Sequence, residues 1–355
     1  MATLTLPPVR PDLALFEGYH SPQLDVDVRL NTNESPYPPP RGWLEAVLEA
    51  VATVPFHRYP DRRAAALRAE LAEQHGVSPD QVLCANGSNE ALQLLCLAYG
   101  GPGRRAAVFE PTYALHSHIA RVTGTEVVAG RRHADFTLDP AEVERVMATG
   151  PEIAFLCSPN NPTGRAEPRE AIDDVVARAP GLVVIDEAYG QFAPWSALEL
   201  VADHRPLVVV RTYSKTWSMA AARLGYLVGP TPLVAELEKV ALPYHLDAVK
   251  QVAGRLALRF RSEMEARVAA LVEERGRVSA ALGELPVETW PSDANFILFR
   301  PLERAGHDVW QGLVDRSVLV RDCSGWPDLD GCLRVTIGTP DENRAFLSAL
   351  REVLL

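Results

Sequence analysis

Short apolar runs alternate along this chain with longer stretches of mixed polarity. The five clearest runs are Val82–Cys84, Ala106–Phe109, Ile153–Leu156, Leu182–Ile185 and Leu207–Val210. Their apolarity is continuous rather than alternating, which is typical of strands buried on both faces of a mostly parallel sheet. Because helical stretches or loops lie between most of them, the pattern predicts an α/β doubly wound domain.

Helical periodicity marks two further regions. Leu67 and Leu71 lie one turn apart within residues 64–73, and Gly76 follows as a stop signal, so we expect a helix there. A long amphipathic pattern over residues 246–282 predicts a second helical region, with a possible break at Gly254. The remaining elements expected are strands at 295–299, near 318–320 and at 333–337, and a last helix from Asp341. These elements indicate a smaller α+β lobe.

A chain of 355 residues exceeds what one core usually organises, so we expect two lobes. Residues 1–40 are rich in proline and end in Ser35-Pro36-Tyr37-Pro38-Pro39-Pro40, which suits neither a helix interior nor a central strand. We therefore divide the chain into an ordered N-terminal arm (1–40), a large domain (41–242) and a small C-terminal domain (243–355).

Polar clusters follow four of the predicted strands. They are Asn86–Glu90, Ser158–Gly164, Asp186–Tyr189 and Arg211–Lys215. Each has an ordinary structural explanation, such as a helix cap, a proline turn or a surface lysine. In open α/β sheets, however, ligands bind beyond the carboxyl ends of the strands. Four such clusters therefore predict one site that is shared by four loops.

The residue types in these clusters match what pyridoxal 5′-phosphate requires. Its aldehyde needs a lysine amine, its pyridine nitrogen a carboxylate, and its phosphate a helix N-terminus with a cation. Its 3′-oxygen needs neutral hydrogen-bond donors. Lys215 is the candidate for the aldehyde and Asp186 for the pyridine nitrogen. The candidates for the phosphate are Gly87, Ser88 and Asn89 together with Arg223. Asn161 and Tyr189 are the candidates for the 3′-oxygen.

The motifs that contain these residues resemble those of a known protein family. The sequence resembles the fold type I aminotransferases and, within them, the histidinol-phosphate aminotransferases. The matching segments are Asn31–Glu34, Tyr59–Asp61, Gly87–Glu90, Pro111–Tyr113, Ser158–Gly164, Asp186–Tyr189, Ser214–Thr216, Arg223–Tyr226, Arg321–Asp322 and Leu333–Gly338. The Ser158–Gly164 motif marks the superfamily, and the two arginine motifs near the C-terminus indicate the histidinol-phosphate branch.

The resemblance implies transamination between histidinol phosphate and 2-oxoglutarate, giving imidazole acetol phosphate and glutamate, in histidine biosynthesis. It implies that Tyr113 stacks on the cofactor ring and that Ser214 joins Arg223 at the phosphate. It also implies a homodimer with shared sites, in which the arm contacts the partner and Tyr59 reaches the partner's phosphate. The implied substrate-pocket residues are Tyr19, Arg321 and Arg334. The sequence departs from the family pattern at Ser35 and at Ala221-Ala222, which leaves substrate choice less constrained than the cofactor.

Composition narrows the function classes. The formal net charge is −11 and no basic arm is present, which disfavours a nucleic-acid partner. Five scattered cysteines without a CxxC pair fit a reducing cytoplasm and predict no metal site. We expect neither a signal peptide nor a membrane span.

Two alternatives use the same fold. One is an aromatic amino-acid aminotransferase or a phosphothreonine-type decarboxylase. The other is the ligand-sensing domain of a transcription regulator, which would carry a basic helix-turn-helix segment that residues 1–40 do not contain.

Overall fold

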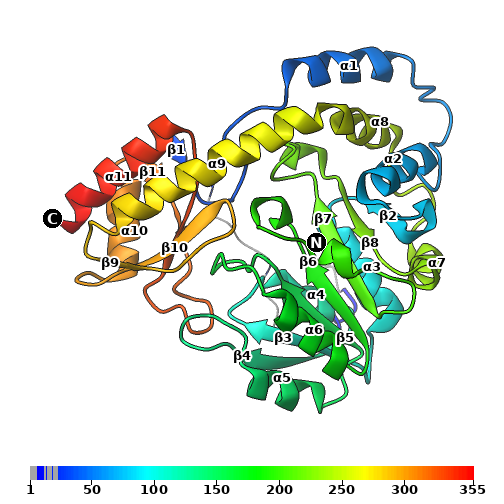
Figure 1. The fold of residues 1–355 in the computed structure, drawn as a ribbon, viewed down its shortest axis with the longest axis horizontal. Coiled ribbons are helices and arrows are strands. Elements are labelled where there is room, and N and C mark those ends of the chain that lie inside the picture. The colour runs from blue at the N-terminus through cyan, green and yellow to red at the C-terminus, as the bar shows by residue number, and fades with distance from the viewer. Residues whose placement is uncertain (1–5, 12, 14–17, 19–22) are drawn as a thin grey trace, which may run out of the picture.

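The computed structural model describes residues 6–11, 13, 18 and 23–355, and its centre is a seven-stranded sheet (Figure 1). The strand order is β2-β8-β7-β6-β5-β3-β4. All neighbours are parallel except β8, which is antiparallel to both β2 and β7. The strands are β2 (Val82–Ala85), β3 (Arg105–Glu110), β4 (Glu126–Arg131), β5 (Ile153–Cys157), β6 (Leu182–Asp186), β7 (Leu207–Thr212) and β8 (Gly225–Val228). The predicted α/β class is confirmed.

Helices cover both faces of this sheet, and successive strand residues contribute to opposite cores. Val184 packs in one core with residues of α3 and α7, whereas Val183 and Ile185 pack in the other with α5 and α6. This explains the continuous apolarity of the strand sequences. The helices on this domain are α2 (Ala65–His75), α3 (Ser88–Tyr99), α4 (Leu115–Val122), α5 (Pro140–Met147), α6 (Arg169–Arg178) and α7 (Thr231–Val240). Short 3₁₀ turns are η1 (Pro79–Gln81), η2 (Gly190–Phe192), η3 (Ala197–Leu200) and η4 (Ala220–Ala222).

The C-terminal part builds a four-stranded antiparallel sheet in the order β12-β13-β10-β9. Its strands are β9 (Val287–Thr289), β10 (Phe296–Pro301), β12 (Arg321–Asp322) and β13 (Leu333–Thr336). It shares a core with α9 (Arg261–Leu282), α10 (Gly306–Val314) and α11 (Pro340–Leu354). Within the arm, β1 (Val28–Arg29) pairs in parallel with β11 (Val318–Leu319), so this end of the arm joins the small lobe.

The long helical region is interrupted, but not at Gly254. It consists of α8 (Ala248–Ala257), the 3₁₀ turn η5 (Leu258–Phe260) and α9. Gly254 lies inside α8, where a Cβ atom would stand 2.3 Å from Leu224 Cδ2, so glycine there serves close packing. The helix α1 (Arg41–Ala52) lies against α8, and Trp43 Nε1 donates to the Ala253 carbonyl at 3.0 Å. Within the described residues, no helix is long and apolar enough to cross a membrane.

Candidate active site

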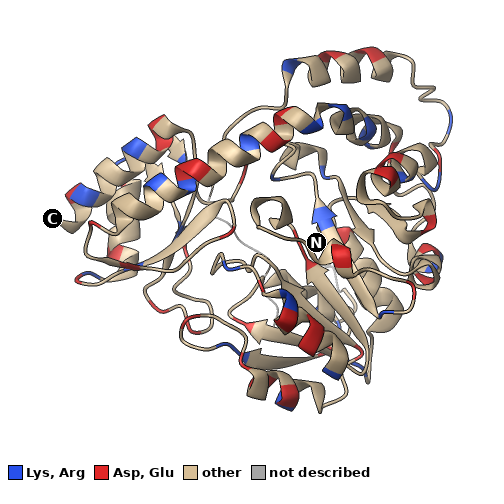
Figure 2. Ribbon diagram, in the orientation of Figure 1, with Lys and Arg blue, Asp and Glu red and all other residues tan. Residues whose placement is uncertain are grey.

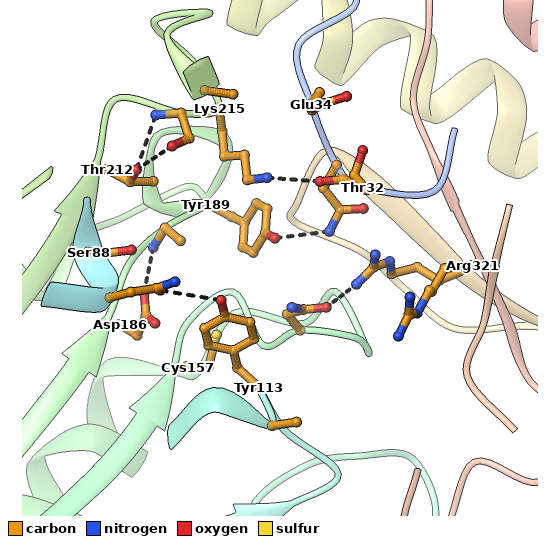
Figure 3. A pocket seen from close by; sticks show the side chains of 18 of the residues that line it. Thr32, Glu34, Ser88, Tyr113, Cys157, Asp186, Tyr189, Thr212, Lys215 and Arg321 are labelled. Carbon is orange, nitrogen blue, oxygen red and sulfur yellow. Dashed lines mark hydrogen bonds between the residues drawn. The ribbon is translucent and has the colours of Figure 1, made fainter. Parts of the chain in front are cut away.

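A cavity of about 400 Å³ lies at the carboxyl ends of the parallel strands, next to the small lobe (Figure 3). Residues of the large domain, of the arm and of the small lobe all line it. The predicted site residues among them are Ser88, Asn89, Tyr113, Asn161, Asp186, Tyr189, Ser214, Lys215, Arg223, Arg321 and Arg334. The four polar clusters therefore do meet in one site, as the strand-end argument predicts.

Lys215 extends into this cavity from the loop after β7, and its Nζ donates to the Thr32 carbonyl of the arm at 2.9 Å (Figure 3). Burial lowers the pKa of Lys215 to about 8, with Arg334 and Arg223 lowering it further and Glu34 opposing them. About a tenth of its amine is therefore neutral at pH 7, far more than for an ordinary lysine. A neutral buried amine is the nucleophile that a carbonyl compound requires.

Asp186 ends β6 and is only 1% exposed. Its Oδ1 accepts from the Ala188 amide at 3.0 Å, and its Oδ2 lies 3.1 Å from His116 Nε2. Because an ionised carboxylate only accepts hydrogen bonds, Nε2 must carry the proton. The His116 ring is fully buried and stacks on Phe155 at 5.0 Å. This histidine was not predicted; its position three residues after Tyr113, on a helix that follows a strand-end loop, was the available signal.

The N-terminus of α3 forms an anion-binding cradle. No side chain caps this helix, and Ser88 and Asn89 of its first turn line the cavity. Gly87 precedes it at φ +80°, and a Cβ there would lie 3.0 Å from Arg223 Nη2. Arg223 Nη1 lies 3.4 Å from Ser214 Oγ. Free backbone amides at a helix start together with a guanidinium are the groups that hold a phosphate.

Two neutral side chains complete the walls near Lys215. The Tyr189 hydroxyl accepts from Asn33 Nδ2 at 2.9 Å, and burial raises the pKa of Tyr189, so it stays a protonated phenol that can donate. Asn161 accepts from Arg334 with its Oδ1, which leaves its Nδ2 as the donor side of the amide. The Tyr113 hydroxyl donates to Asn89 Oδ1 at 3.4 Å. From the sequence, Asn33 was named only as part of the matching segment Asn31–Glu34, and no role was predicted for it.

Arg321 and Arg334 are directly opposite each other on neighbouring antiparallel strands, and both line the cavity. Arg334 is 5% exposed, donates to the Asn31 carbonyl at 2.8 Å and lies over the Phe296 ring at 5.2 Å. Arg321 lies over the Trp326 ring at 6.0 Å. Like charges directly opposite in a sheet repel each other, so an anion bound between them would be stabilising.

This local positive charge contrasts with the rest of the molecule. Acidic and basic residues are interleaved along α9 and the other outer helices (Figure 2), and the formal net charge is −11. Among the described residues no carboxylate forms an ion pair with Arg334. Attraction of an anionic substrate must therefore come from the pocket itself.

Two of the predicted residues that the structure describes, Gly87 and Tyr59, do not line this cavity. Gly87 precedes α3, and its lack of a Cβ leaves room for the Arg223 guanidinium beside the helix start. Tyr59 is 81% exposed, stacks on Tyr244 with ring centroids 4.5 Å apart, and is not part of the cavity lining. Tyr19 lies outside the described residues. In the part of the chain that the structure describes, no group of three His, Cys, Asp or Glu residues could hold a metal ion.

Comparisons with known proteins agree with this geometry. Residues 26–350 match the family described as aminotransferase class I and II. A histidinol-phosphate aminotransferase of Frankia casuarinae is 47% identical over 98% of this chain and 90% of its own, and one of Rhodococcus jostii is 45% identical over 98% and 93%. The fold is shared with the crystal structure of histidinol-phosphate aminotransferase from Sinorhizobium meliloti in complex with pyridoxal-5′-phosphate, with a TM-score of 0.84, 21% identity and coverage of 93% and 91%. The chain therefore belongs to the class I and II aminotransferase family, in the group of the histidinol-phosphate aminotransferases.

Proposed function

We propose that this protein is a pyridoxal-phosphate-dependent aminotransferase that acts on histidinol phosphate. It interconverts histidinol phosphate and 2-oxoglutarate with imidazole acetol phosphate and glutamate, in histidine biosynthesis. The observation that carries the proposal is the opposed pair Arg321 and Arg334 in one cavity with Lys215. Guanidinium groups bind phosphate and carboxylate alike, so one pocket can take a phosphorylated amine and a dicarboxylic amino acid in turn.

The residues of the cavity fit the cofactor. The α3 amides with Ser214 and Arg223 would hold its phosphate, and Asp186 its pyridine nitrogen. Tyr113 would cover the ring face, while Asn161 and Tyr189 would donate to the 3′-oxygen. When bound, pyridoxal phosphate supplies a reactive aldehyde and an electron-withdrawing ring.

The protein's own groups then perform the remaining chemistry. Lys215 would hold the cofactor through its aldehyde and, once the substrate amine has replaced it there, its free amine would be the group that accepts the substrate α-carbon proton and gives it back. Its lowered pKa suits this role, because it increases the fraction of neutral amine near neutral pH. Asp186, positioned by His116 and the Ala188 amide, would be the carboxylate that keeps a proton on the pyridine nitrogen.

We also propose a homodimer in the cytoplasm, with active sites shared through Tyr59. Its support is that large apolar side chains are exposed on α1 and in the segments that carry Tyr59 and Tyr244: Leu44, Leu48, Phe56, Leu242 and Tyr244. Leu44 and Leu48 are one turn apart on α1, and Tyr244 stacks on Tyr59. Exposed apolar residues of this kind are typical of an interface, and a second copy is the partner we infer. The arm (1–40), large domain (41–242) and small domain (243–355) are the division we propose for this subunit.

A panel of amino donors tests the substrate. Single-turnover reactions with histidinol phosphate, glutamate and phenylalanine, followed through the bound cofactor's visible absorbance, should give the highest kcat/KM for histidinol phosphate. A preference for phenylalanine would favour the aromatic aminotransferase. Release of carbon dioxide from phosphothreonine would favour the decarboxylase. The L-threonine-O-3-phosphate decarboxylase of Porphyromonas gingivalis shares this fold, with a TM-score of 0.81 and 22% identity.

A further inference from the structure

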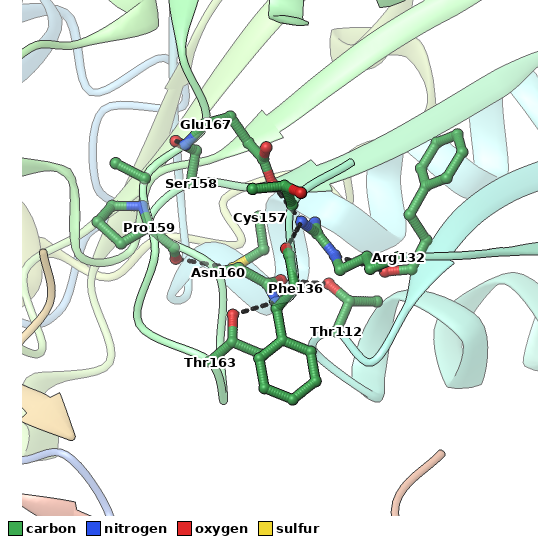
Figure 4. A network of polar contacts seen from close by, with 12 residues as sticks. Thr112, Arg132, Phe136, Cys157, Ser158, Pro159, Asn160, Thr163 and Glu167 are labelled. Carbon is green, nitrogen blue, oxygen red and sulfur yellow. Dashed lines mark hydrogen bonds and ion pairs between the residues drawn. The ribbon is translucent and has the colours of Figure 1, made fainter. Parts of the chain in front are cut away.

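Asn160 is a fully buried amide that ties together two loops of the active site (Figure 4). Its Nδ2 donates to the Pro111 carbonyl and to Thr163 Oγ1, both at 2.9 Å. Its Oδ1 accepts from Thr112 Oγ1 at 2.8 Å. Its backbone amide donates to the Arg165 carbonyl at 2.7 Å. The side chain therefore uses both donor and acceptor groups within the protein, away from the cavity.

Each loop that Asn160 joins presents a neighbouring residue to the cavity. Thr112 immediately precedes Tyr113, which lines the cavity from the loop after β3. Asn161 immediately follows Asn160 and contacts Arg334 of the small lobe. Asn160 itself is not among the lining residues. The Thr112–Asn160 hydrogen bond thus links the Tyr113 wall to the Asn161–Arg334 wall.

A buried ion pair holds the bases of the same two loops. Arg132 donates to Glu167 Oε1 at 2.5 Å and to the carbonyl of Phe109 at 3.1 Å, in the strand that leads to Tyr113. The Glu167 amide donates to Ser158 Oγ at 3.0 Å, at the start of the other loop. Arg132 and Glu167 therefore fix the bases of both loops. Asn160 joins the tips of the two loops by two hydrogen bonds, one from Thr112 Oγ1 and one to the Pro111 carbonyl.

We propose that Asn160, through Thr112, is a positioning residue that sets the spacing between Tyr113 and Asn161. This inference rests on the proposed function, since Tyr113 and Asn161 are there assigned to the cofactor ring and its 3′-oxygen. Hydrogen bonds outside the cavity would hold Tyr113 and Asn161 in place and so keep the ring in one orientation. The groups of these two residues that contact the ligand stay available for it. A tilt of the ring would change the rate without emptying the site.

Two threonines form a matched test. Thr112→Val removes the hydroxyl that donates to Asn160 across the loops, and Thr163→Val removes a hydroxyl that accepts from Asn160 within one loop. Both positions are buried and both changes keep the side-chain shape. We expect Thr112→Val to lower kcat/KM for histidinol phosphate roughly tenfold and to weaken the visible circular dichroism of the bound cofactor. Thr163→Val should lower the melting temperature by about as much as Thr112→Val does, but should leave kcat/KM and the dichroism close to the parent values. Thr112→Ser, which keeps the hydroxyl, should have kcat/KM and dichroism close to those of the parent.

Equal effects of Thr112→Val and Thr163→Val on kcat/KM and on the dichroism would overturn the proposal, because the bonds would then only stabilise the loops. If Thr112→Val does not fold, Thr112→Ala supplies the same comparison. Failure of the proposed function is a separate result, in which the parent enzyme does not transaminate histidinol phosphate. The dichroism comparison would still test the link in that case.

Discussion

Replacing Arg321 and Arg334 by alanine, one at a time, separates the two kinds of anion that a single pocket must accept. Arg334 is 5% exposed and also donates to Asn161 and to the Asn31 carbonyl. Arg334→Ala should therefore weaken the half-reactions with histidinol phosphate and with glutamate. Arg321→Ala should impair the histidinol-phosphate half-reaction more, because a phosphate offers three terminal oxygens to two guanidinium forks, whereas one fork satisfies a carboxylate.

The size of the effect follows from the bonds that are lost. A hydrogen bond to a charged group contributes about 1.5–3 kcal/mol. Each 1.36 kcal/mol corresponds to roughly a tenfold change in rate, so we expect kcat/KM to fall by roughly ten- to hundredfold. Arg334→Ala should lie at the upper end, since it also removes the donor to the Asn31 carbonyl, which the buried guanidinium reaches at 2.8 Å.

Stopped-flow half-reactions with each substrate measure these losses separately. Arg300→Ala is a matched control, because Arg300 belongs to the same small sheet and lies over a tryptophan ring, that of Trp290 at 5.5 Å, but is not part of the cavity lining. It should leave both half-reactions unchanged. If Arg321→Ala and Arg334→Ala also have negligible effects on both substrates, the pocket does not recognise a phosphorylated amine, although the pyridoxal enzyme would stand.

The other predictions concern the cofactor and the assembly. Lys215→Ala should abolish turnover and the visible absorbance of bound cofactor; borohydride treatment of the parent should attach the cofactor to Lys215, and attachment to Lys239 would refute the assignment. Capture of pyridoxal phosphate by the cofactor-free protein should accelerate with pH and level off above about 8, because burial lowers the pKa of Lys215 and only its neutral amine reacts; a midpoint near the ordinary lysine value of 10.5 would contradict this. Asp186→Ala should cut turnover severely, and a cofactor analogue with a permanent positive charge on the ring nitrogen should restore part of it; near-parent activity would give Asp186 another role. Mixing Tyr59→Ala with Lys215→Ala chains should regenerate activity if subunits exchange, whereas a fully active monomer in sedimentation would exclude a shared site.

Strands and strand-end residues were predictable because both follow from local chemistry. Continuous apolar runs located β5, β6 and β7, and the polar residues after them located Asp186 and Lys215. The strands β4 and β8 were not predicted. In β4 only Gly130 is buried, so its sequence carries a weak apolar signal.

Contacts between distant segments were not predictable from one sequence. His116 and Asp186 are 70 positions apart, and Thr112 and Asn160 are 48 apart. His116 and Thr112 do not stand out locally, since a histidine on a helix or a threonine in a turn has many ordinary roles. Only the folded sheet, which brings the ends of β3, β5 and β6 to one edge, shows that these groups meet.

Arg334 connects substrate binding to the chemistry at Lys215. Burial is the main reason why the pKa of Lys215 is low, and the charge of Arg334 is the next. An anionic substrate group that neutralises Arg334 removes that second cause and leaves the lysine more basic. The charge of Arg334 therefore increases the fraction of neutral, nucleophilic amine in the empty pocket, and its neutralisation by a bound anion would raise the pKa of Lys215. A proton acceptor that strengthens on substrate binding is what removal of the α-carbon proton requires.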